Sequence, residues 1–314
     1  MLVLNGVDSV PPAARGAALA IGNFDGVHRG HQVLLAAARK EAAEAHAARA
    51  GVILFEPHPR EFFQPDKPHF RVTPLPRKLQ LLGEFGIEVA VVLPFDAKLA
   101  ALTAQDFIER VLVDALAVRH VIVGYDFHFG KGRAGDPDTM RRGGAAHGFG
   151  VTVVAQVADA GEVFSSNAIR AELAQGDVRG AAEMLGRWWR VTGTVIGGAK
   201  RGAGLGFPTA NIALLPGTAL AHGIYAVRVH LDGAVHAGAA YLGTRPTFDN
   251  GAAVLEVFLL DFEGDLYGRN IEVEFIEFLR GDRHFGNIED LKVQMSADCA
   301  RAATILERSP PQPP

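Results

Sequence analysis

The chain has 314 residues, of which 48% are hydrophobic and 21% are charged, with a formal net charge of −4 at pH 7. This length favours two domains, and the near balance of charges predicts neither a nucleic-acid nor a membrane partner, while the sequence makes no prediction of the oligomeric state. The single Cys299 excludes an intramolecular disulfide, and the absence of a signal-peptide pattern or a bilayer-length apolar run leads us to expect a soluble, cytoplasmic protein.

The first half of the chain alternates short β-rich runs with helical patterns. The predicted strands are Ala17–Ile21, Val52–Phe55, Glu88–Leu93, His120–Val123 and Val151–Gln156, and the predicted helices are His31–Ala50, Pro76–Phe85, Ala104–Leu116 and Pro137–His147. This alternation predicts an α/β fold with a doubly wound parallel sheet. Ligands of such sheets bind beyond the carboxyl ends of the strands, near a topological switch point.

The second half has a different pattern. Two short helices are predicted at Asn167–Ala174 and Val178–Leu185, and β-rich segments separated by glycine turns follow from residue 189 to about 279. Closely spaced strands without intervening helices predict an antiparallel barrel. A final helix, Ile288–Glu307, is expected to pack outside it.

These patterns divide the chain into two predicted domains and a tail. The N-terminal domain covers residues 1–186 and the barrel domain residues 187–308, with the boundary near Gly186–Trp189. The proline-rich residues 309–314 are expected to be disordered.

A pair of histidines stands where the first predicted strand turns into the first predicted helix. The stretch "GNFDGVHRGH", residues 22–31, puts His28 and His31 at the helix entrance, about one turn apart and on one side. A helix N-terminus favours phosphate, and imidazoles there can donate hydrogen bonds to phosphoryl oxygens as charge builds on them. The alternative of one core and one surface histidine stays open.

A glycine-rich loop in the second half precedes a polar pair. In "GAGLGFPTANI", the glycines, including Gly202 and Gly204, allow backbone N–H groups to wrap a phosphate. An extended segment directs Thr209 and Asn211 to one face, where a hydroxyl and an amide oxygen suit Mg²⁺ bound together with phosphates. A simple polar turn after the loop is the alternative.

One carboxylate interrupts an apolar strand further along. In "AVLEVFLLDF", Glu256 is the charged residue within a run of apolar ones. If this strand lines the barrel, the carboxylate leaves bulk water, and a raised pKa would make it a general base. Alternatively, Glu256 faces solvent from an edge strand.

The N-terminal motifs resemble the nucleotidyltransferase (FMN adenylyltransferase) domain of bacterial bifunctional riboflavin kinase/FAD synthetases. The resemblance rests on "GNFDGVHRGH", "FEPHP", "VIVGYDFHFGKGRAGD" and "FSSNAIR", in that order. It implies that the backbone approaches ATP at Gly22, Asn23 and Phe24, and that His28 and His31 stabilise the transition state.

The same resemblance implies roles for residues further along the N-terminal half. Ser165 and Ser166 would cap a helix facing phosphate, and Arg170 would bind the leaving pyrophosphate. His58 and Asp126 would lie near the flavin. Asn167 stands where related enzymes often have serine or threonine.

The C-terminal motifs resemble the riboflavin kinase module of the same enzymes. "GFPTANI", "HGIYAVRV", "GTRPTF", "LEVFLLDF" and "LYG" match it in order. The resemblance implies a six-stranded barrel in which Thr209 and Asn211 hold Mg-ATP, Glu256 accepts a proton from the ribityl hydroxyl of riboflavin, and Arg283 shapes the flavin site. Where Ala203 replaces a common arginine, Lys200 or Arg201 could supply the charge.

We therefore expect an enzyme that makes FMN from riboflavin and ATP in its second half and FAD from FMN and ATP in its first. Riboflavin, FMN, FAD and ATP are its expected small-molecule partners, and Mg²⁺ its cofactor. One rival is a single-activity adenylyltransferase with a degenerate barrel, and another is a flavin-storing protein. A nicotinamide oxidoreductase is disfavoured because "GKGRAG", residues 130–135, does not form the turn after the first strand.

Overall fold

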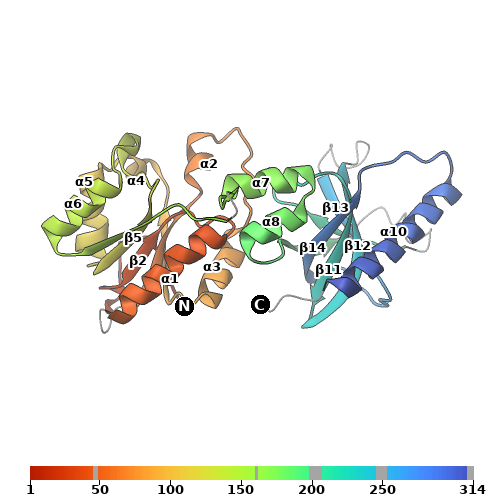
Figure 1. Ribbon diagram of the computed structural model, residues 1–314, viewed down its shortest axis with the longest axis horizontal. Helices are drawn as coiled ribbons and strands as arrows, with labels where there is room; N and C mark the ends of the chain where they lie inside the picture. The colour runs from red at the N-terminus through yellow and green to blue at the C-terminus, as the bar shows by residue number, and fades with distance from the viewer. Residues whose placement is uncertain (45–48, 160–161, 198–206, 245–252, 310–314) are drawn as a thin grey trace. The chain divides into compact units, whose positions relative to one another are not determined.

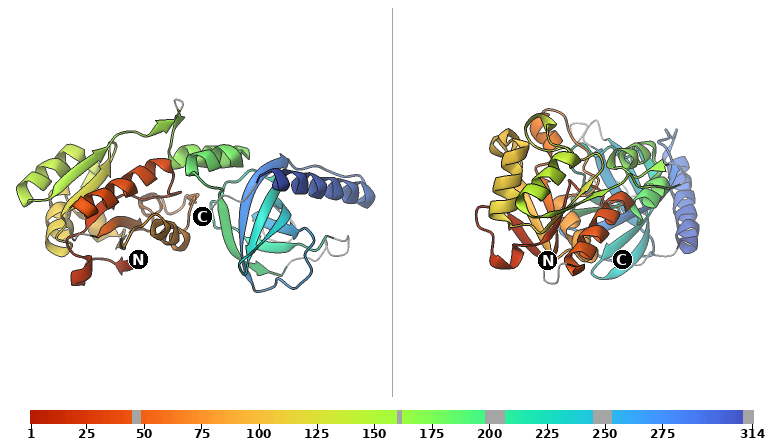
Figure 2. Two further views of the ribbon diagram at one scale, coloured as in Figure 1. Left: turned by 60° about the horizontal axis from the view of Figure 1, so that its bottom comes forward. Right: turned by 60° about the vertical axis from the view of Figure 1, so that its left-hand side comes forward.

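The computed structural model describes residues 1–44, 49–159, 162–197, 207–244 and 253–309. The chain divides into two compact units, Met1–Ser166 (the N-terminal unit) and Asn167–Pro314 (the C-terminal unit). Figures 1 and 2 show the elements of each. The boundary between the units thus falls earlier in the chain than the predicted one, and the two short helices that the sequence analysis assigned to the first domain belong to the C-terminal unit.

The N-terminal unit is built on a six-stranded sheet in the order β1-β4-β3-β2-β5-β6, and all of its pairings are parallel. The strands are β1 (Leu2–Asn5), β2 (Ala18–Ile21), β3 (Ala50–Glu56), β4 (Val89–Pro94), β5 (His120–Gly124) and β6 (Gly150–Val154). The chain proceeds from β2 to β3 and β4 on one side, and returns to β5 and β6 on the other. The topological switch point therefore lies at β2, between β3 and β5.

Helices cover both faces of this sheet, as Figure 1 shows. They are α1 (Arg29–Glu44), α2 (Pro59–Phe63), α3 (Leu75–Glu84), α4 (Ala97–Ala101), α5 (Ala104–Asp106) continuing into a π-helical segment (Phe107–Ala115), and α6 (Pro137–His147), with 3₁₀ turns at Pro12–Ala14 and Lys131–Arg133. Leu35 of α1 and Leu82 of α3 pack on one face, whereas Ile108 and Met140 pack on the other. The predicted doubly wound α/β fold is confirmed.

The first predicted helix, His31–Ala50, extends too far along the chain. Helix α1 is described as far as Glu44, residues 45–48 lie outside the described part, and Ala50 begins β3, where it pairs with Ala18 of β2. Alanine favours helices locally, but burial of Ala50 in the sheet overrides that preference. The sequence pattern also missed β1, α2 and α4, which are short.

Two helices have the predicted bounds because their caps are explicit in the sequence. The Asp136 side chain accepts a hydrogen bond from Thr139 N at 2.7 Å to start α6, and the left-handed Gly148 ends it. In the same way Asp177 starts α8 (Val178–Leu185), and Gly186 ends it.

The C-terminal unit is a closed barrel in the order β10-β13-β12-β11-β14-β9, with all pairings antiparallel. Its elements are β9 (Arg190–Ile196), β10 (Ala210–Ala213), β11 (Gly223–Leu231), β12 (Ala234–Thr244), β13 (Ala253–Leu259), β14 (Asn270–Arg280) and α10 (Ile288–Arg308). Ala302 and Leu306 of α10 pack against Ala226, Ala239 and Ile276 on the outside of the barrel. The predicted six-stranded barrel with a terminal helix is confirmed.

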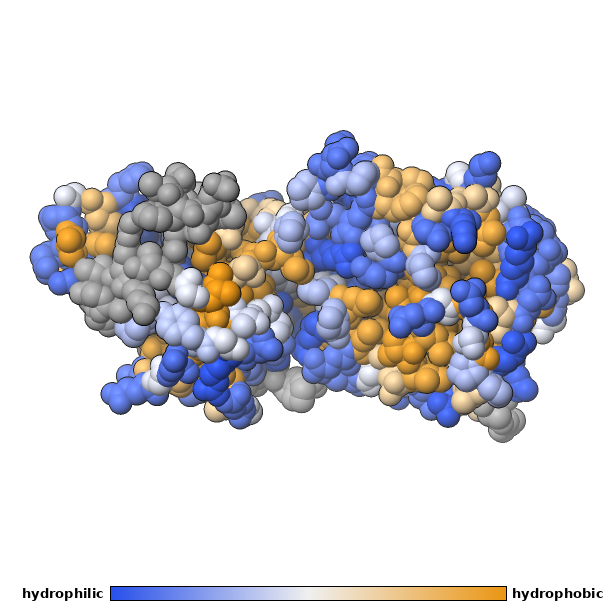
Figure 3. All heavy atoms as spheres, turned by 180° about the vertical axis from the view of Figure 1, so that it is seen from behind, coloured by the Kyte–Doolittle hydropathy of each residue, from blue (hydrophilic) through white to orange (hydrophobic). Residues whose placement is uncertain are grey.

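The remaining elements are α7 (Ser166–Gln175) and a short hairpin, β7 (Ala158–Asp159) and β8 (Glu162–Val163). No helix in the described part of the chain has both the length and the apolar character needed to cross a membrane. Figure 3 shows hydrophobic residues exposed beside hydrophilic ones on one face of the N-terminal unit.

Candidate functional site

The loop between β2 and α1 occupies the switch point of the sheet. Phe24 and Val27 have left-handed backbone angles, with φ of 48° and 43°, although neither is glycine. Both side chains are fully buried, so packing holds the loop in this strained form. Because the Phe24 side chain is buried, the contact with nucleotide predicted for Phe24 would have to be made by its backbone.

The two predicted histidines meet at the start of α1. Their rings stack with centroids 3.6 Å apart, and His28 Nδ1 accepts a hydrogen bond from the backbone N–H of His31 at 3.3 Å. His28 thus acts as the N-cap of α1, and the proton of its neutral ring lies on Nε2. Gly30 permits this packing, because a Cβ there would lie 3.1 Å from the His28 ring.

Asp25 anchors the same loop, a role that the sequence analysis missed. Its buried carboxylate accepts hydrogen bonds from the backbone amides of Val72 at 3.1 Å and Thr73 at 2.9 Å. Its carbonyl accepts a hydrogen bond from Ser166 Oγ at 2.8 Å. Ser166 is the first residue of α7, so its hydroxyl fastens this loop instead of capping the helix as predicted.

Asn23 combines a tied backbone with an available side chain. Its carbonyl accepts a hydrogen bond from Lys78 Nζ at 2.8 Å. Its Oδ1 is buried and has no hydrogen-bond partner among the residues that the structure describes. The preceding Gly22 donates to the carbonyl of Ile53 in β3 at 3.2 Å. The Asn23 amide is therefore suited to receiving a donor group of a ligand.

His58 lies at the same edge of the sheet, where β3 ends. Its Nδ1 accepts a hydrogen bond from Arg60 N at 3.1 Å, which caps α2, and its ring lies 4.5 Å from that of His69. Arg71 pairs with Glu56 at 2.7 Å and with Glu61. The hydrogen bond from Arg71 is the main reason that the pKa of Glu61 is lowered.

Asp126 is exposed and follows β5, the strand on the other side of β2. The carboxyl ends of β2, β3 and β5 are neighbours, so the loops that carry Asn23, His58 and Asp126 leave the sheet at one edge. The stretch from Gly130 to Gly135 forms a turn closed by a bridge between Phe129 and Gly135, which is unlike a dinucleotide-binding turn.

Arg170 and Ser165 have less direct support. Arg170 lies on the first turns of α7, and its Nη1 donates to Asn167 Oδ1 at 2.9 Å. Ser165 precedes the helix. Their predicted roles toward phosphate remain predictions.

In the barrel, three predicted residues come together. Asn211 of β10 is directly opposite Glu256 of β13, and Thr209 Oγ1 lies 3.4 Å from Glu256 Oε2. Asn211 is buried, and Glu256 is partly exposed. A hydroxyl, an amide and a carboxylate thus share one face of the sheet.

Glu256 does not line the barrel interior. Its neighbours Leu255 and Val257 are fully buried and face the interior, and alternation along a strand directs Glu256 to the outer face. Of the two alternatives left open by the sequence, the interior position of Glu256 is therefore wrong, and its side chain lies on the outer face of a barrel strand. The alternation was hidden because apolar residues occupy both faces of β13.

The other predicted residues of this half lie apart or outside the described residues. Arg283 Nη1 donates to Gln294 of α10 at 3.1 Å, and its guanidinium lies 5.7 Å from the Phe285 ring. These contacts anchor the loop before α10. Lys200, Gly202 and Gly204 lie outside the described residues.

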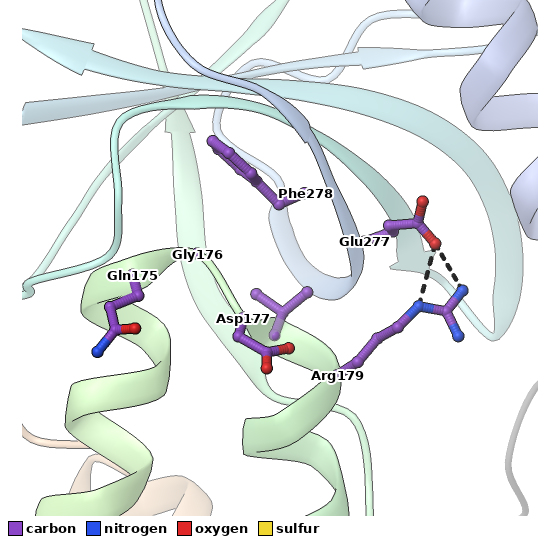
Figure 4. Close-up of a pocket in the computed structure, with 7 residues that line it drawn as sticks. Gln175, Gly176, Asp177, Arg179, Glu277 and Phe278 are labelled. Atoms are coloured by element: carbon purple, nitrogen blue, oxygen red, sulfur yellow. Dashed lines mark hydrogen bonds and ion pairs between the residues drawn. The ribbon is translucent and has the colours of Figure 1, made fainter.

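One cavity of the C-terminal unit, of about 660 Å³, is bounded by Pro208, next to Thr209, and by Phe258 and Asp261. A second cavity, of about 300 Å³, lies where α7 meets α8 and is lined by Arg179, Glu277 and other residues labelled in Figure 4. None of the predicted site residues lines the second cavity.

Comparisons with known proteins match the two halves of the chain to two different families. The family described as "FAD synthetase" matches residues 10–168, and that described as "Riboflavin kinase" matches residues 185–306. A "Bifunctional riboflavin kinase/FMN adenylyltransferase" of Pseudomonas fluorescens is 42% identical, over 98% of this chain and 99% of the relative. The protein of that name from Escherichia coli K12 is 39% identical, over 95% and 96%.

A solved structure has the same architecture throughout. A crystal structure described as a macrolide-efflux protein from Streptococcus pneumoniae matches with a TM-score of 0.84 and 26% identity, over 96% of this chain and 99% of that one. The words "macrolide-efflux protein" describe the matched structure and are not applied to this chain.

A parallel sheet with a histidine pair at its switch point, joined to a barrel with a polar cluster on one face, defines a two-domain, phosphate-transferring enzyme. More specifically, the chain belongs to the family of bifunctional riboflavin kinase/FMN adenylyltransferases. Its C-terminal half phosphorylates riboflavin to FMN, and its N-terminal half transfers the adenylyl group of ATP to FMN, giving FAD and pyrophosphate. The single-activity, storage and oxidoreductase rivals are set aside.

Proposed function

We propose that adenylyl transfer takes place at the loop between β2 and α1, with His28 and His31 as the catalytic residues. A phosphate oxygen of FMN attacks the α-phosphorus of ATP, and the bond to the bridging oxygen breaks to release pyrophosphate. The imidazole N–H groups would stabilise the charge that builds on the phosphoryl oxygens. The stacked pair at the N-terminus of α1 is the observation that supports this assignment.

Neighbouring residues of this unit would bind the two substrates. Gly22 and Asn23 would contact the nucleotide, with the buried Asn23 Oδ1 accepting a hydrogen bond from it. His58 and Asp126, whose loops leave the same sheet edge, would contact the flavin nucleotide. Ser165 and Arg170 would bind phosphate, as the motif resemblance implies.

We propose that phosphoryl transfer to riboflavin takes place on the outer face of β10 and β13. The Glu256 carboxylate would accept the proton of the ribityl hydroxyl, whose oxygen attacks the γ-phosphorus of ATP while ADP leaves. The opposed register of Asn211 and Glu256, with Thr209 beside them, supports this assignment. Access from solvent on the outer face suits a base that must exchange its proton each cycle. Lys200, Gly202 and Gly204 would complete the phosphate loop, and Arg283 would shape the flavin site.

The chemistry of this cluster fits Mg²⁺. A threonine hydroxyl and an asparagine amide oxygen beside a carboxylate are hard oxygen ligands, and Mg²⁺ commonly takes few protein ligands together with nucleotide phosphates. Thr209 and Asn211 would hold the ion, which would neutralise charge on the ATP phosphates.

The single free Cys299 supports a cytoplasmic location, because disulfides are rare in that reducing compartment.

Product analysis tests both assignments in one preparation. The purified chain is incubated with riboflavin, ATP and Mg²⁺, and the flavins are separated by chromatography. We expect FAD from the parent, FMN from His28→Ala and unreacted riboflavin from Glu256→Gln. His147→Ala, on α6, and Glu289→Gln, on α10, serve as matched controls that should make FAD. FAD formation by His28→Ala would refute the first assignment, and FMN formation by Glu256→Gln the second.

A further inference from the structure

Lys78 is a buried cation next to the adenylyl-transfer loop that no step above uses. It lies on α3, its side chain is only 6% exposed, and its Nζ donates to the carbonyl of Asn23 at 2.8 Å. Lysine is seldom buried, because removing an ammonium from water is costly unless polar groups compensate. A shorter or apolar residue could fill this volume, so the hydrogen bond to the loop is the distinctive contribution of Lys78.

A second tie joins the same two segments. The Asp25 carboxylate accepts hydrogen bonds from the amides of Val72 and Thr73, just before α3. In both ties the loop provides the acceptor: the Asn23 carbonyl for the Lys78 ammonium, and the Asp25 carboxylate for the two amides. The two ties are separated by one residue of the loop, Phe24.

Phe24 is where the loop is strained. Its φ of 48° is unfavourable for a residue with a side chain, and the turn it makes leads directly to Val27 and His28. Such a conformation persists only where surrounding contacts fix it. Hydrogen bonds on both sides of Phe24, from Lys78 at Asn23 and to Asp25, supply that restraint.

We propose that Lys78 is a positioning residue for adenylyl transfer, acting through the Asn23 carbonyl to hold the strained loop and hence the position of His28. This inference rests on the proposed role of that loop. Positioning matters because a displacement of about 1 Å of catalytic groups can cost on the order of 10²-fold in rate.

The charge of Lys78 provides a test of the positioning role, because a residue that contributed only packing would not make FAD formation depend on pH. Burial is the main effect on the pKa of Lys78 and lowers it; Arg71 lowers it further, whereas Asp25, Glu56 and Glu61 oppose the shift. The Lys78 ammonium should therefore lose its proton at a pH below the usual pKa of lysine. Loss of the charge weakens its hydrogen bond to the Asn23 carbonyl. An arginine in its place stays charged over that range.

The experiment compares Lys78→Met, Lys78→Arg and the exposed control Lys67→Met in the full-length chain. FMN-to-FAD conversion and riboflavin-to-FMN conversion are measured on each preparation, the second being an internal control for the C-terminal unit. We expect Lys78→Met to lower kcat for FAD formation on the order of 10²-fold, with riboflavin phosphorylation unchanged. Lys67→Met should leave both activities unchanged, and Lys78→Arg should exceed Lys78→Met in FAD formation.

The pH profile provides the second readout and does not depend on the folding of the methionine variant. FAD formation by the parent should decline on the alkaline side, and Lys78→Arg should lack that decline. An unchanged rate in Lys78→Met, or an alkaline decline in Lys78→Arg identical to that of the parent, would overturn the inference. If His28→Ala also retains FAD formation, the proposed function of the loop fails; if only the Lys78 variants do, the positioning role alone fails.

Discussion

His28 Nδ1 accepts a hydrogen bond from the backbone amide of His31 at 3.3 Å, while the two rings stack 3.6 Å apart. One side of the His28 ring is thus used to cap α1, and the other, Nε2–H, is the side that would donate to phosphate. The structural and the proposed catalytic role of this residue belong to different nitrogens, so different substitutions should separate them.

Asparagine and glutamine at position 28 are the substitutions that make this separation. The Asn side chain can reproduce the acceptor at Nδ1, and the longer Gln can carry a donor toward the position of Nε2. We expect His28→Asn to have the same midpoint temperature of thermal unfolding as the parent. It should form FAD roughly 10²–10³-fold more slowly, which is the cost of losing one charge-stabilising donor. His28→Gln should retain more activity and unfold at a lower temperature. Thermal unfolding by circular dichroism and FAD assays check this; the reverse order of activities would contradict it.

Thr209 offers a comparable test in the barrel. Its hydroxyl lies 3.4 Å from Glu256 and is proposed to hold Mg²⁺. Thr209→Val keeps the shape but removes the hydroxyl, so we expect riboflavin phosphorylation to fall roughly tenfold or more and to require more Mg²⁺. Thr209→Ser should stay near the parent. A Mg²⁺ titration of FMN formation measures this, with the exposed Thr304→Val of α10 as control. A valine variant with the parent Mg²⁺ dependence would exclude Thr209 as a ligand.

What the sequence could predict depended on whether the signal was local. Helices α6 and α8 were predicted to the residue because Asp and Gly caps mark their ends. The histidine pair was found because its spacing is that of one helical turn.

Features set by distant partners could not be read in this way. The Lys78 tie to Asn23 spans 55 positions, and no local pattern indicates it. The face to which Glu256 points depends on strand register, because Val254 and Phe258 on its own face are apolar too. Periodicity therefore could not distinguish an interior from an outer position.

The ion pair that fastens α10 to the barrel should contribute to stability. Arg280 Nη2 lies 2.7 Å from the buried carboxylate of Asp298. We expect Asp298→Asn to lower the free energy of unfolding by about 2 kcal/mol, below the roughly 3–5 kcal/mol of a fully buried pair, because the Arg280 side chain is partly exposed.

Tryptophan fluorescence during urea unfolding measures this change in the C-terminal unit, since both tryptophans of the chain, Trp188 and Trp189, lie in it. The exposed pair of Glu289 and Lys292 gives the control, and Glu289→Gln should change stability by less than about 0.5 kcal/mol. Equal effects of the two substitutions would contradict a special role for Asp298.

Acid should weaken the C-terminal unit through Glu274. Burial alone would raise the pKa of this carboxyl, but His230, whose Nε2 lies 3.7 Å away, and the hydrogen bonds and charges of Arg190 and Arg228 outweigh it and lower the pKa to about 2. A folded-state pKa below the unfolded value of 4.5 stabilises the fold above pH 4.5, and this contribution, about 3 kcal/mol, is lost as the pH falls toward 2.

Urea unfolding followed by tryptophan fluorescence at pH 6 and at pH 3 measures this loss. The free energy of unfolding should fall between the two pH values, and the fall should be smaller in Glu274→Gln, which carries no titrating group at this position. The exposed Glu263→Gln should retain the pH dependence of the parent; a Glu274→Gln variant that retains it as well would show that other carboxylates cause the acid sensitivity.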